Sequence, residues 1–475
     1  MKYIDKITIY IDFIFRNYNI LKLNYLNIKY LLFLFIFIGI KKYSLIIKES
    51  NRLLNYNYIT IQNEYNITFN NNLKKKINIG IYAFGIKNGG RARSTSLLIN
   101  YFNNISIFNL YLFTRRLKED DEYKIPDDIK RILIKDNDLI NKIKKNKIHI
   151  LIYQLSLHNE IKALNNLNIV KVIFYQHLGI FDWIYGNYSI FKLIYRDYIH
   201  SKYIVNIVPY ENDYLFKKWG IRSIFMNNFM TYNFTKIIES NLSSKTILMI
   251  GRGDAKKKRF EIGIQAMEYI NQEIPQSDML IISNLSGVYR HEILINNLKL
   301  KNIIKFVGYT ASPEIYYKNA TLNLFPSISE AFPLVICETK IYGIPNILLG
   351  LDYTSISEGG TIIIYDETPE SFAKIAIKVI KSDRYRYKLG KLARNSMKIF
   401  DNNKLLIKWI KLVLSIYNGD KFYNALREQN NILPQEKILD IIIKQTNLLR
   451  KRIPIFHNVN INDIENFNYM ENIIK

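Results

Sequence analysis

The chain has a single cysteine, Cys337, among its 475 residues. One cysteine excludes an internal disulfide framework and fits a reducing compartment. The sequence also lacks the cysteine and histidine spacing of a zinc site, and it lacks the aromatic and basic motif of proteins that read RNA. A disulfide-stapled domain and a zinc-binding module are therefore not expected.

A long hydrophobic run is missing as well. The most apolar stretch, residues 30–40, is shorter than the roughly 20 residues that a spanning helix needs. Lys41 and Lys42 follow it, and no small-residue cleavage site comes after them. A buried helix, a membrane-interface helix and a weak signal anchor all stay open. We expect the protein on the cytoplasmic side, either free or membrane-associated through this segment.

Two motifs of nucleotide enzymes are absent too. No GxxxxGK loop occurs, which argues against a phosphate-loop enzyme. No Asp-x-Asp run stands at the end of a predicted strand, and Asp120 and Asp121 lie in a charged connector.

Positive charge, in contrast, is abundant. The chain has 67 basic and 41 acidic residues, which gives a net charge of +26. Such an excess favours anionic partners, namely nucleic acid, an acidic membrane surface or phosphorylated small molecules. The basic residues are scattered in short clusters, so charge alone does not choose among these partners.

Short apolar runs alternate with amphipathic segments in two successive series. The pattern predicts parallel sheets covered on both faces, and hence an α/β protein with two doubly wound Rossmann-like domains facing a cleft. The predicted strands of the first series are residues 77–84, 105–113, 148–153, 170–175, 204–208 and 223–226. Those of the second series are residues 246–250, 279–283, 303–307, 322–325, 346–349 and 361–364.

This alternation predicts the following organisation. An N-terminal extension with the short apolar segment covers residues 1–76, the first Rossmann-like domain covers 77–235, and the second covers 245–400. C-terminal helices and a tail cover 401–475.

The first candidate site follows the predicted strand 246–250. Gly251 allows a tight turn, Arg252 offers a planar fork for phosphate oxygens, and Lys258 or Lys257 adds a second positive charge. An ordinary loop with a solvated charge run is the alternative interpretation.

The second candidate site follows the predicted strand 322–325. Glu330 precedes a predicted helix that begins at Pro333, and Glu338 lies within that helix among apolar neighbours. Proline at the first helical position would leave free N–H groups at Leu334 and its neighbours, which can bind an anion. Two surface glutamates on an amphipathic helix are the alternative. A carboxylate in an apolar setting is costly, however, which favours a functional role for Glu338.

Together these residues resemble the donor-binding domain of the family 4 glycosyltransferases, which have the GT-B fold. Glu330 and Glu338 match the E-x7-E signature of that family, and Arg252 and Lys258 match its diphosphate clamp. The resemblance covers residues 246–380. Pro333 is a departure, because many members have glycine there.

The resemblance implies roles for individual residues. The donor diphosphate would be held by Gly251, Arg252 and Lys258, with Lys257 as the alternative to Lys258. Glu330 would contact the transferred sugar, and Glu338 would bind the ribose hydroxyls. Backbone contacts to the donor would come from Phe332 and Leu334. In the acceptor-side domain, Gly89, Gly90 and Arg93 would face the donor phosphates or the acceptor, and His177 would reach the sugar. A simple turn and a structural histidine are the respective alternatives.

The family also implies the chemistry, which is transfer with retention at the anomeric carbon. The resemblance further implies that no metal and no cofactor are bound, and the absence of an Asp-x-Asp run is consistent with this. The catalytic residues would be Glu330, His177, Arg252 and Lys258. The expected partners are a nucleotide-diphosphate sugar as donor and a hydroxyl acceptor on a carbohydrate, a lipid-linked compound or a protein. Peripheral contact with an anionic membrane stays open, and nucleic acid is not expected as a partner. The rival functions are a sugar-nucleotide epimerase, a phosphorylase, and a nucleic-acid or membrane-surface binding protein on an altered scaffold.

Overall fold

The computed structural model describes most of the chain after residue 75. The described residues are 76–419 and Tyr423, except 88, 136–137, 155–157, 180–195, 209–210, 212–214, 216–219, 233–236, 253–255, 285–287, 311, 352–355 and 357. The apolar segment 30–40 lies outside them. No helix in the described part of the chain is long and apolar enough to cross a membrane.

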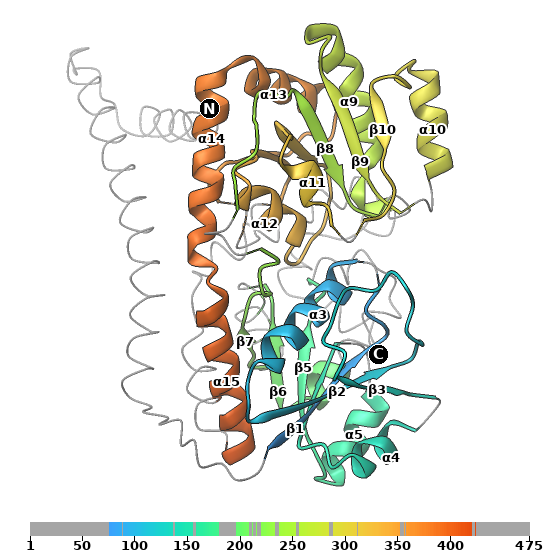
Figure 1. Cartoon of the computed structure of the whole chain (residues 1–475), viewed down its shortest axis with the longest axis vertical. Coiled ribbons are helices and arrows are strands. Elements are labelled where there is room, and N and C mark those ends of the chain that lie inside the picture. The colour runs from blue at the N-terminus through green and yellow to red at the C-terminus, as the bar shows by residue number, and fades with distance from the viewer. Residues whose placement is uncertain are drawn as a thin grey trace, which may run out of the picture. The chain divides into compact units, whose positions relative to one another are not determined.

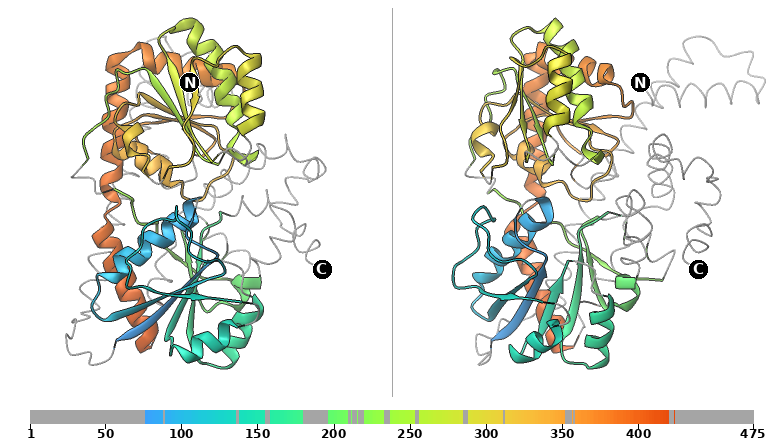
Figure 2. Two further views of the ribbon diagram at one scale, coloured as in Figure 1. Left: turned by 45° about the vertical axis from the view of Figure 1, so that its right-hand side comes forward. Right: turned by 90° about the vertical axis from the view of Figure 1, so that its right-hand side faces the viewer.

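The first domain is a parallel sheet of seven described strands in the order β3-β2-β1-β4-β5-β6-β7. The inner strands are short and almost wholly buried, because helices cover both faces of the sheet (Figures 1 and 2). The strands are β1 (Ile77–Ala83), β2 (Phe108–Thr114), β3 (Lys130–Leu133), β4 (Ile150–Tyr153), β5 (Lys171–Gln176), β6 (Tyr203–Asn206) and β7 (Ile224–Phe225). The helices are α3 (Gly89–Asn103), α4 (Leu139–Lys145) and α5 (His158–Asn166).

The second domain is a parallel sheet of six described strands in the order β10-β9-β8-β11-β12-β13. Its strands are β8 (Thr246–Ile250), β9 (Asp278–Ile282), β10 (Ile304–Phe306), β11 (Leu322–Phe325), β12 (Asn346–Leu349) and β13 (Thr361–Ile364). Its helical elements are η2 (Lys256–Lys258), α9 (Phe260–Glu273), α10 (Val288–Asn297), α11 (Glu314–Tyr317), α12 (Leu334–Ile341), α13 (Pro369–Lys381), α14 (Asp383–Ser396) and η3 (Met397–Ile399). The strand order reverses between β8 and β11, as it does between β1 and β4, and ligands bind at such switch points.

These two sheets confirm the predicted fold class of two doubly wound α/β domains. The sequence pattern missed β3, and its composition explains why. Of its four residues only Ile132 is buried, because β3 is an edge strand. A strand with one buried side chain has no apolar run to reveal it.

The last described helix, α15 (Asn402–Asn418), returns to the first domain (Figure 1). Trp409 is fully buried and packs edge-on against Phe102 and Tyr175, with ring centroids 5.8 and 5.0 Å away. Asn402 bonds to the crossover between the domains, accepting from the Met230 amide at 2.7 Å and donating to its carbonyl oxygen at 2.9 Å. The core of the first domain thus contains residues from both ends of the described chain.

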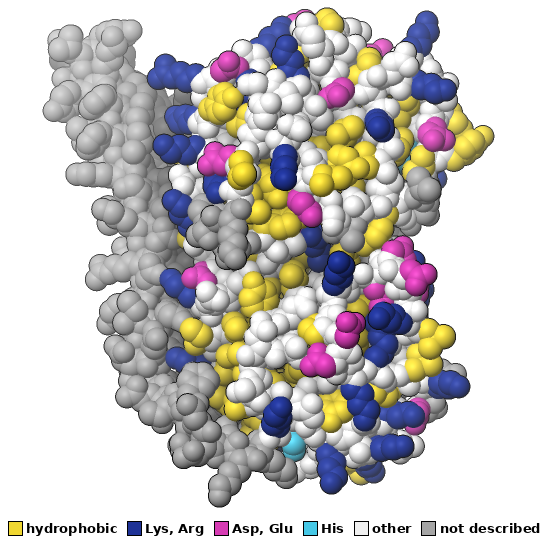
Figure 3. All heavy atoms as spheres, in the orientation of Figure 1, with side chains coloured by type: hydrophobic (Ala, Val, Ile, Leu, Met, Phe, Trp, Pro, Cys, Tyr) yellow, Lys and Arg dark blue, Asp and Glu magenta, His cyan; other side chains and the backbone are white. Residues whose placement is uncertain are grey.

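The basic residues show no single concentrated patch on the face shown in Figure 3. Lys and Arg side chains are spread over both domains on this face, with Asp and Glu between them. The surface charge visible there therefore resembles the scattered pattern of the sequence.

Candidate active site

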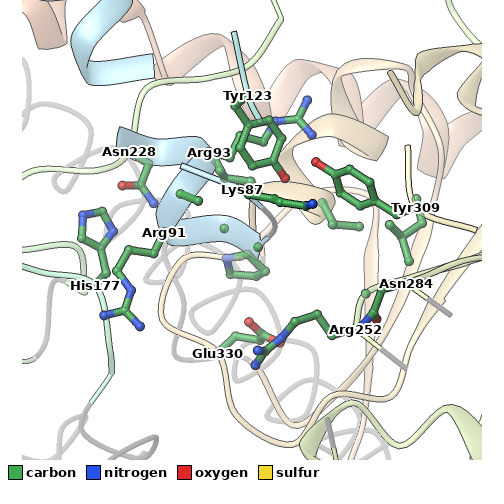
Figure 4. A pocket seen from close by; sticks show the side chains of 18 of the residues that line it. Lys87, Arg91, Arg93, Tyr123, His177, Asn228, Arg252, Asn284, Tyr309 and Glu330 are labelled. Atoms are coloured by element: carbon green, nitrogen blue, oxygen red, sulfur yellow. The ribbon is translucent and has the colours of Figure 1, made fainter. Parts of the chain in front are cut away.

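A pocket of about 610 Å³ is lined by residues from the carboxyl ends of strands in both sheets. In Figure 4 the labelled residues of the two domains surround this pocket. Every site residue predicted from the sequence lines it: Gly89, Gly90, Arg93, His177, Gly251, Arg252, Lys257, Lys258, Glu330, Phe332, Leu334 and Glu338. Its size is typical of a small-molecule site.

The loop after β8 brings positive charge to one side of the pocket. Arg252 is exposed there. The Lys258 ammonium forms an ion pair with Glu330 Oε1 and lies 4.9 Å from the centre of the Phe325 ring. The carbonyl oxygen of Lys257 accepts from the Ile328 amide at 3.0 Å, which ties this loop to the one after β11.

Glu330 is held by two donors on the same oxygen. Besides Lys258, the Ser327 hydroxyl donates to Oε1 at 2.6 Å. Its side chain is 11% exposed, so the carboxylate is fixed at the wall of the pocket. An oriented carboxylate in this position can accept hydrogen bonds from ligand hydroxyls.

The helix after Glu330 starts one residue later than the sequence predicts. Pro333 has φ −71° and ψ 101°, so it is the N-cap and Leu334 is the first helical residue. The Pro333 carbonyl accepts from the Ile336 amide at 3.0 Å. The amides of Leu334 and Val335 precede the first intrahelical bonds, and both residues line the pocket. This helix start still presents N–H groups and the positive end of the dipole to the pocket.

Glu338 is buried, with 1% of its surface exposed. Its carboxylate accepts from the Tyr317 hydroxyl at 2.7 Å and from the Thr231 hydroxyl at 2.8 Å, and Arg93 Nη2 lies 3.3 Å away. Burial and the Glu338 charge together raise the pKa of Tyr317, which therefore stays protonated as a donor. A carboxylate has about four acceptor positions, so three donors leave capacity for a ligand hydroxyl.

His177 follows β5 and lines the pocket with 8% of its surface exposed. Its Nε2 has no hydrogen-bond partner among the described residues. Burial, with a smaller contribution from the Arg91 charge, lowers the pKa of His177 to about 3. The imidazole is thus neutral near pH 7, which suits a hydrogen-bonding role more than one as a cation.

Most of the residues that line the pocket lay outside the sequence-based site prediction, and Phe84, Arg91 and Arg116 are three of them. Phe84 directly follows β1, Arg116 comes two residues after the end of β2, and Arg91 lies in the first turn of α3. The signal was available for two of them, because residues just after parallel strands face the ligand edge of a sheet. Among the described residues, no group of three or more His, Cys, Asp or Glu side chains is placed so that it could hold a metal ion.

Comparisons with known proteins agree with this architecture. Residues 233–396 match the model of the family described as Glycosyl transferases group 1. An uncharacterized glycosyltransferase of Haemophilus influenzae is 22% identical over 134 residues, which are 26% of this chain and 38% of that protein. The matched region thus spans well under half of that relative.

Solved structures resemble a larger part of the chain. Sucrose-phosphate synthase from Thermosynechococcus elongatus has a TM-score of 0.59 at 16% identity, covering 72% of this chain and 99% of the other. Anabaena HepE in complex with UDP and glucose has a TM-score of 0.57 at 12% identity, over 71% and 99%. A variant of S. aureus TarM in complex with Fondaparinux, alpha-GlcNAc-glycerol and UDP has a TM-score of 0.58 at 13% identity, over 73% and 100%.

At such identities these structures establish the fold, which is GT-B, and the family match covers the domain that holds Arg252, Lys258 and both glutamates. The second domain, residues 233–396, thus matches the family of glycosyl transferases group 1.

Proposed function

We propose that this protein is a glycosyltransferase that moves a sugar from a nucleotide-diphosphate donor to a hydroxyl acceptor. One observation carries the proposal. Arg252, Lys258, the start of α12 and Glu330 border a single pocket between two doubly wound domains. A guanidinium, an ammonium and a helix N-terminus suit a diphosphate, while a fixed carboxylate suits sugar hydroxyls. Anabaena HepE and TarM, whose folds are similar, have structures in complex with UDP, which supports this type of donor.

The proposed reaction breaks the bond between the anomeric carbon and the diphosphate oxygen, and it forms a bond from that carbon to the acceptor oxygen. Negative charge develops on the leaving diphosphate, where Arg252, Lys258 and the amides at the start of α12 would stabilise it. The acceptor proton would pass to the departing phosphate oxygen, so no separate protein base is required. Glu338 would accept hydrogen bonds from the ribose hydroxyls, which would replace one of its present donors. We propose retention of the anomeric configuration on the resemblance of Glu330 and Glu338 to the E-x7-E signature.

The test is donor turnover, measured as release of nucleoside diphosphate across a panel of nucleotide sugars. Before turnover is measured, the donor is identified as the nucleotide sugar of the panel that raises the melting temperature of the protein. Arg252→Ala and Glu330→Ala should each lower turnover at least about 100-fold, as the loss of a charge-stabilising group does in other enzymes. Arg290→Ala, at an exposed arginine of α10 outside the pocket, is the matched control. Folded Arg252→Ala and Glu330→Ala proteins with full turnover would refute the assignment.

A further inference from the structure

We infer that Arg93 competes with the donor ribose for Glu338, so that a nucleotide binds only by displacing this guanidinium. The inference rests on the proposed sugar transfer, in which Glu338 accepts the ribose hydroxyls, and it assigns a regulatory role to a side chain of the opposite domain. Both residues line the pocket, Arg93 from α3 of the first domain and Glu338 from α12 of the second.

The first argument is the limited room around the Glu338 carboxylate, which accepts about four hydrogen bonds. The Thr231 hydroxyl donates to Oε1 at 2.8 Å, and the Tyr317 hydroxyl donates to Oε2 at 2.7 Å. Arg93 Nη2 lies 3.3 Å from Oε1. A ribose presents a pair of neighbouring hydroxyls, and both cannot bind beside all of these groups. One present partner must therefore leave.

Tyr317 is fixed within the second domain. Its side chain is fully buried, and its ring packs against Tyr232 and Tyr342, with ring centroids 6.3 and 5.2 Å away. Helices α11 and α12 belong to the same domain, so the bond from Tyr317 to Glu338 does not depend on the position of the other domain. This hydroxyl therefore stays at Oε2.

Thr231 is fixed by the residues on either side of it in the crossover segment. The Met230 amide donates to the Asn402 side chain at 2.7 Å. The Tyr232 hydroxyl donates to Glu314 at 3.0 Å. The Thr231 hydroxyl cannot withdraw from Oε1 without moving a backbone that is anchored on both sides.

Arg93 is the partner that can leave. Its contact with Glu338 is the longest of the three, and its long side chain is 13% exposed at the pocket. The guanidinium also lies 5.5 Å from the centre of the Tyr123 ring, and Figure 4 shows both side chains at the pocket. The start of α3 leaves room nearby, because a Cβ added to Gly89 or Gly90 would meet no described atom within 4 Å. Rotation of this one side chain therefore frees the acceptor position on Oε1 that the ribose requires.

This exchange links nucleotide binding to the contact between the domains. Arg93 and Glu338 form a largely buried ion pair from one domain to the other, and the ribose hydroxyls that replace the guanidinium carry no charge. Separating a buried ion pair is costly, so this cost offsets part of the binding energy of the ribose. The ion pair thus lowers the affinity for nucleotide, and its re-formation favours the release of nucleoside diphosphate after transfer.

The test compares a nucleoside diphosphate with its 2′,3′-dideoxyribose form, which lacks both ribose hydroxyls. Calorimetry with UDP, GDP, ADP and CDP first identifies the nucleotide that binds most tightly. The dissociation constant of its dideoxy form, divided by that of its ribose form, then measures what the hydroxyls contribute. We expect this ratio to be at least about tenfold higher in Arg93→Gln than in the wild type, because hydrogen bonds to the carboxylate then form without breaking an ion pair.

The ratio separates competition from the other effects of the substitution. Arg93→Gln also removes a positive charge from the pocket, but this loss affects both forms of the nucleotide alike, as a merely structural role of Arg93 would. Arg93→Lys keeps a cation in α3 and should raise the ratio less, and it provides the same comparison if the glutamine variant does not fold. Arg290→Gln, at an exposed residue outside the pocket, should keep the ratio of the wild type.

A ratio that stays the same or falls in Arg93→Gln would overturn the inference, because Arg93 would then not compete with the ribose. In the double variant with Glu338→Gln the rise should disappear. If it persists, the ribose does not bind at Glu338, and the inference falls while nucleotide binding still supports the proposed transfer. Failure of all four nucleoside diphosphates to bind the intact protein would instead remove the proposed function and this inference with it.

Discussion

Arg93 in the first domain and Glu338 in the second form an ion pair across the pocket, with 3.3 Å between Nη2 and Oε1. Their side chains are only 13% and 2% exposed. The carboxylate that we propose as the ribose ligand therefore also links the domains.

Loss of Arg93 should destabilise the protein. Arg93→Leu leaves the buried Glu338 carboxylate with two hydroxyl donors and no cation, and we expect a loss of about 3–5 kcal/mol in the free energy of unfolding. The double variant with Glu338→Gln should cost less than the sum of the two single changes. Urea unfolding of all four proteins gives the coupling energy, and strict additivity would show that the pair does not interact.

Ser327 should act by positioning Glu330. Ser327→Ala removes the 2.6 Å hydrogen bond to Oε1 and leaves Lys258 to hold the carboxylate. We expect kcat to fall about tenfold, with a change in donor KM of less than about threefold. Steady-state kinetics with the identified donor decides this. A rise in KM at unchanged kcat would mean that Glu330 contributes to binding but not to the transition state.

His177 should make stability sensitive to acid. With a folded pKa of about 3 against about 6.5 in the unfolded chain, only the unfolded chain binds this proton between those pH values. Stability from the neutral imidazole is complete above about pH 6.5 and is lost as the pH falls towards 3. We expect the stability of the wild type relative to His177→Gln to fall by about 1–2 kcal/mol between pH 7.5 and pH 5. Urea unfolding at both pH values measures it, and a pH-independent difference would contradict the neutral buried state.

Lys340 should have a signature of the same sign, but at alkaline pH. Its ammonium is buried in α12 and donates to the carbonyl oxygens of Ile356, at 2.6 Å, and Glu358. Burial lowers its pKa to about 8, so the unfolded chain binds one more proton between pH 8 and about 10.5. The wild type should therefore gain about 2 kcal/mol relative to Lys340→Met from pH 8 to pH 10, and only about 0.4 kcal/mol from pH 6 to pH 8. A difference that stays flat up to pH 10 would show that Lys340 titrates normally.

The sequence predicted those parts of the fold whose signal is local. Residues 246–250, 322–325, 346–349 and 361–364 are predicted as strands and form strands with the same bounds. Their apolar runs are short and continuous, as expected for a sheet covered on both faces. The edge strand β3 had no comparable signal, because it lacks an apolar run. The later start of α12 had none either, because proline is accommodated both at the N-cap and at the first helical residue.

The position of the pocket could be predicted from the sequence, but the contacts among the residues that line it could not. The rule that ligands bind beyond the carboxyl ends of parallel strands brings Arg252, Glu330 and His177 to one edge. The partners of Glu338 are Arg93, Thr231 and Tyr317, which come from a helix of the other domain, the crossover segment and α11. Such contacts depend on how whole elements pack, and no spacing in the chain encodes them.

The return of α15 has a consequence for biosynthesis. Trp409 fills the interior of the first domain, yet a ribosome makes it after every strand of the second. The nascent first domain must therefore wait with part of its apolar interior uncovered until the second domain has emerged. Expression of the first domain by itself would require α15 to be grafted onto it, and cleavage just before Asn402 would damage the more distant, earlier half of the molecule.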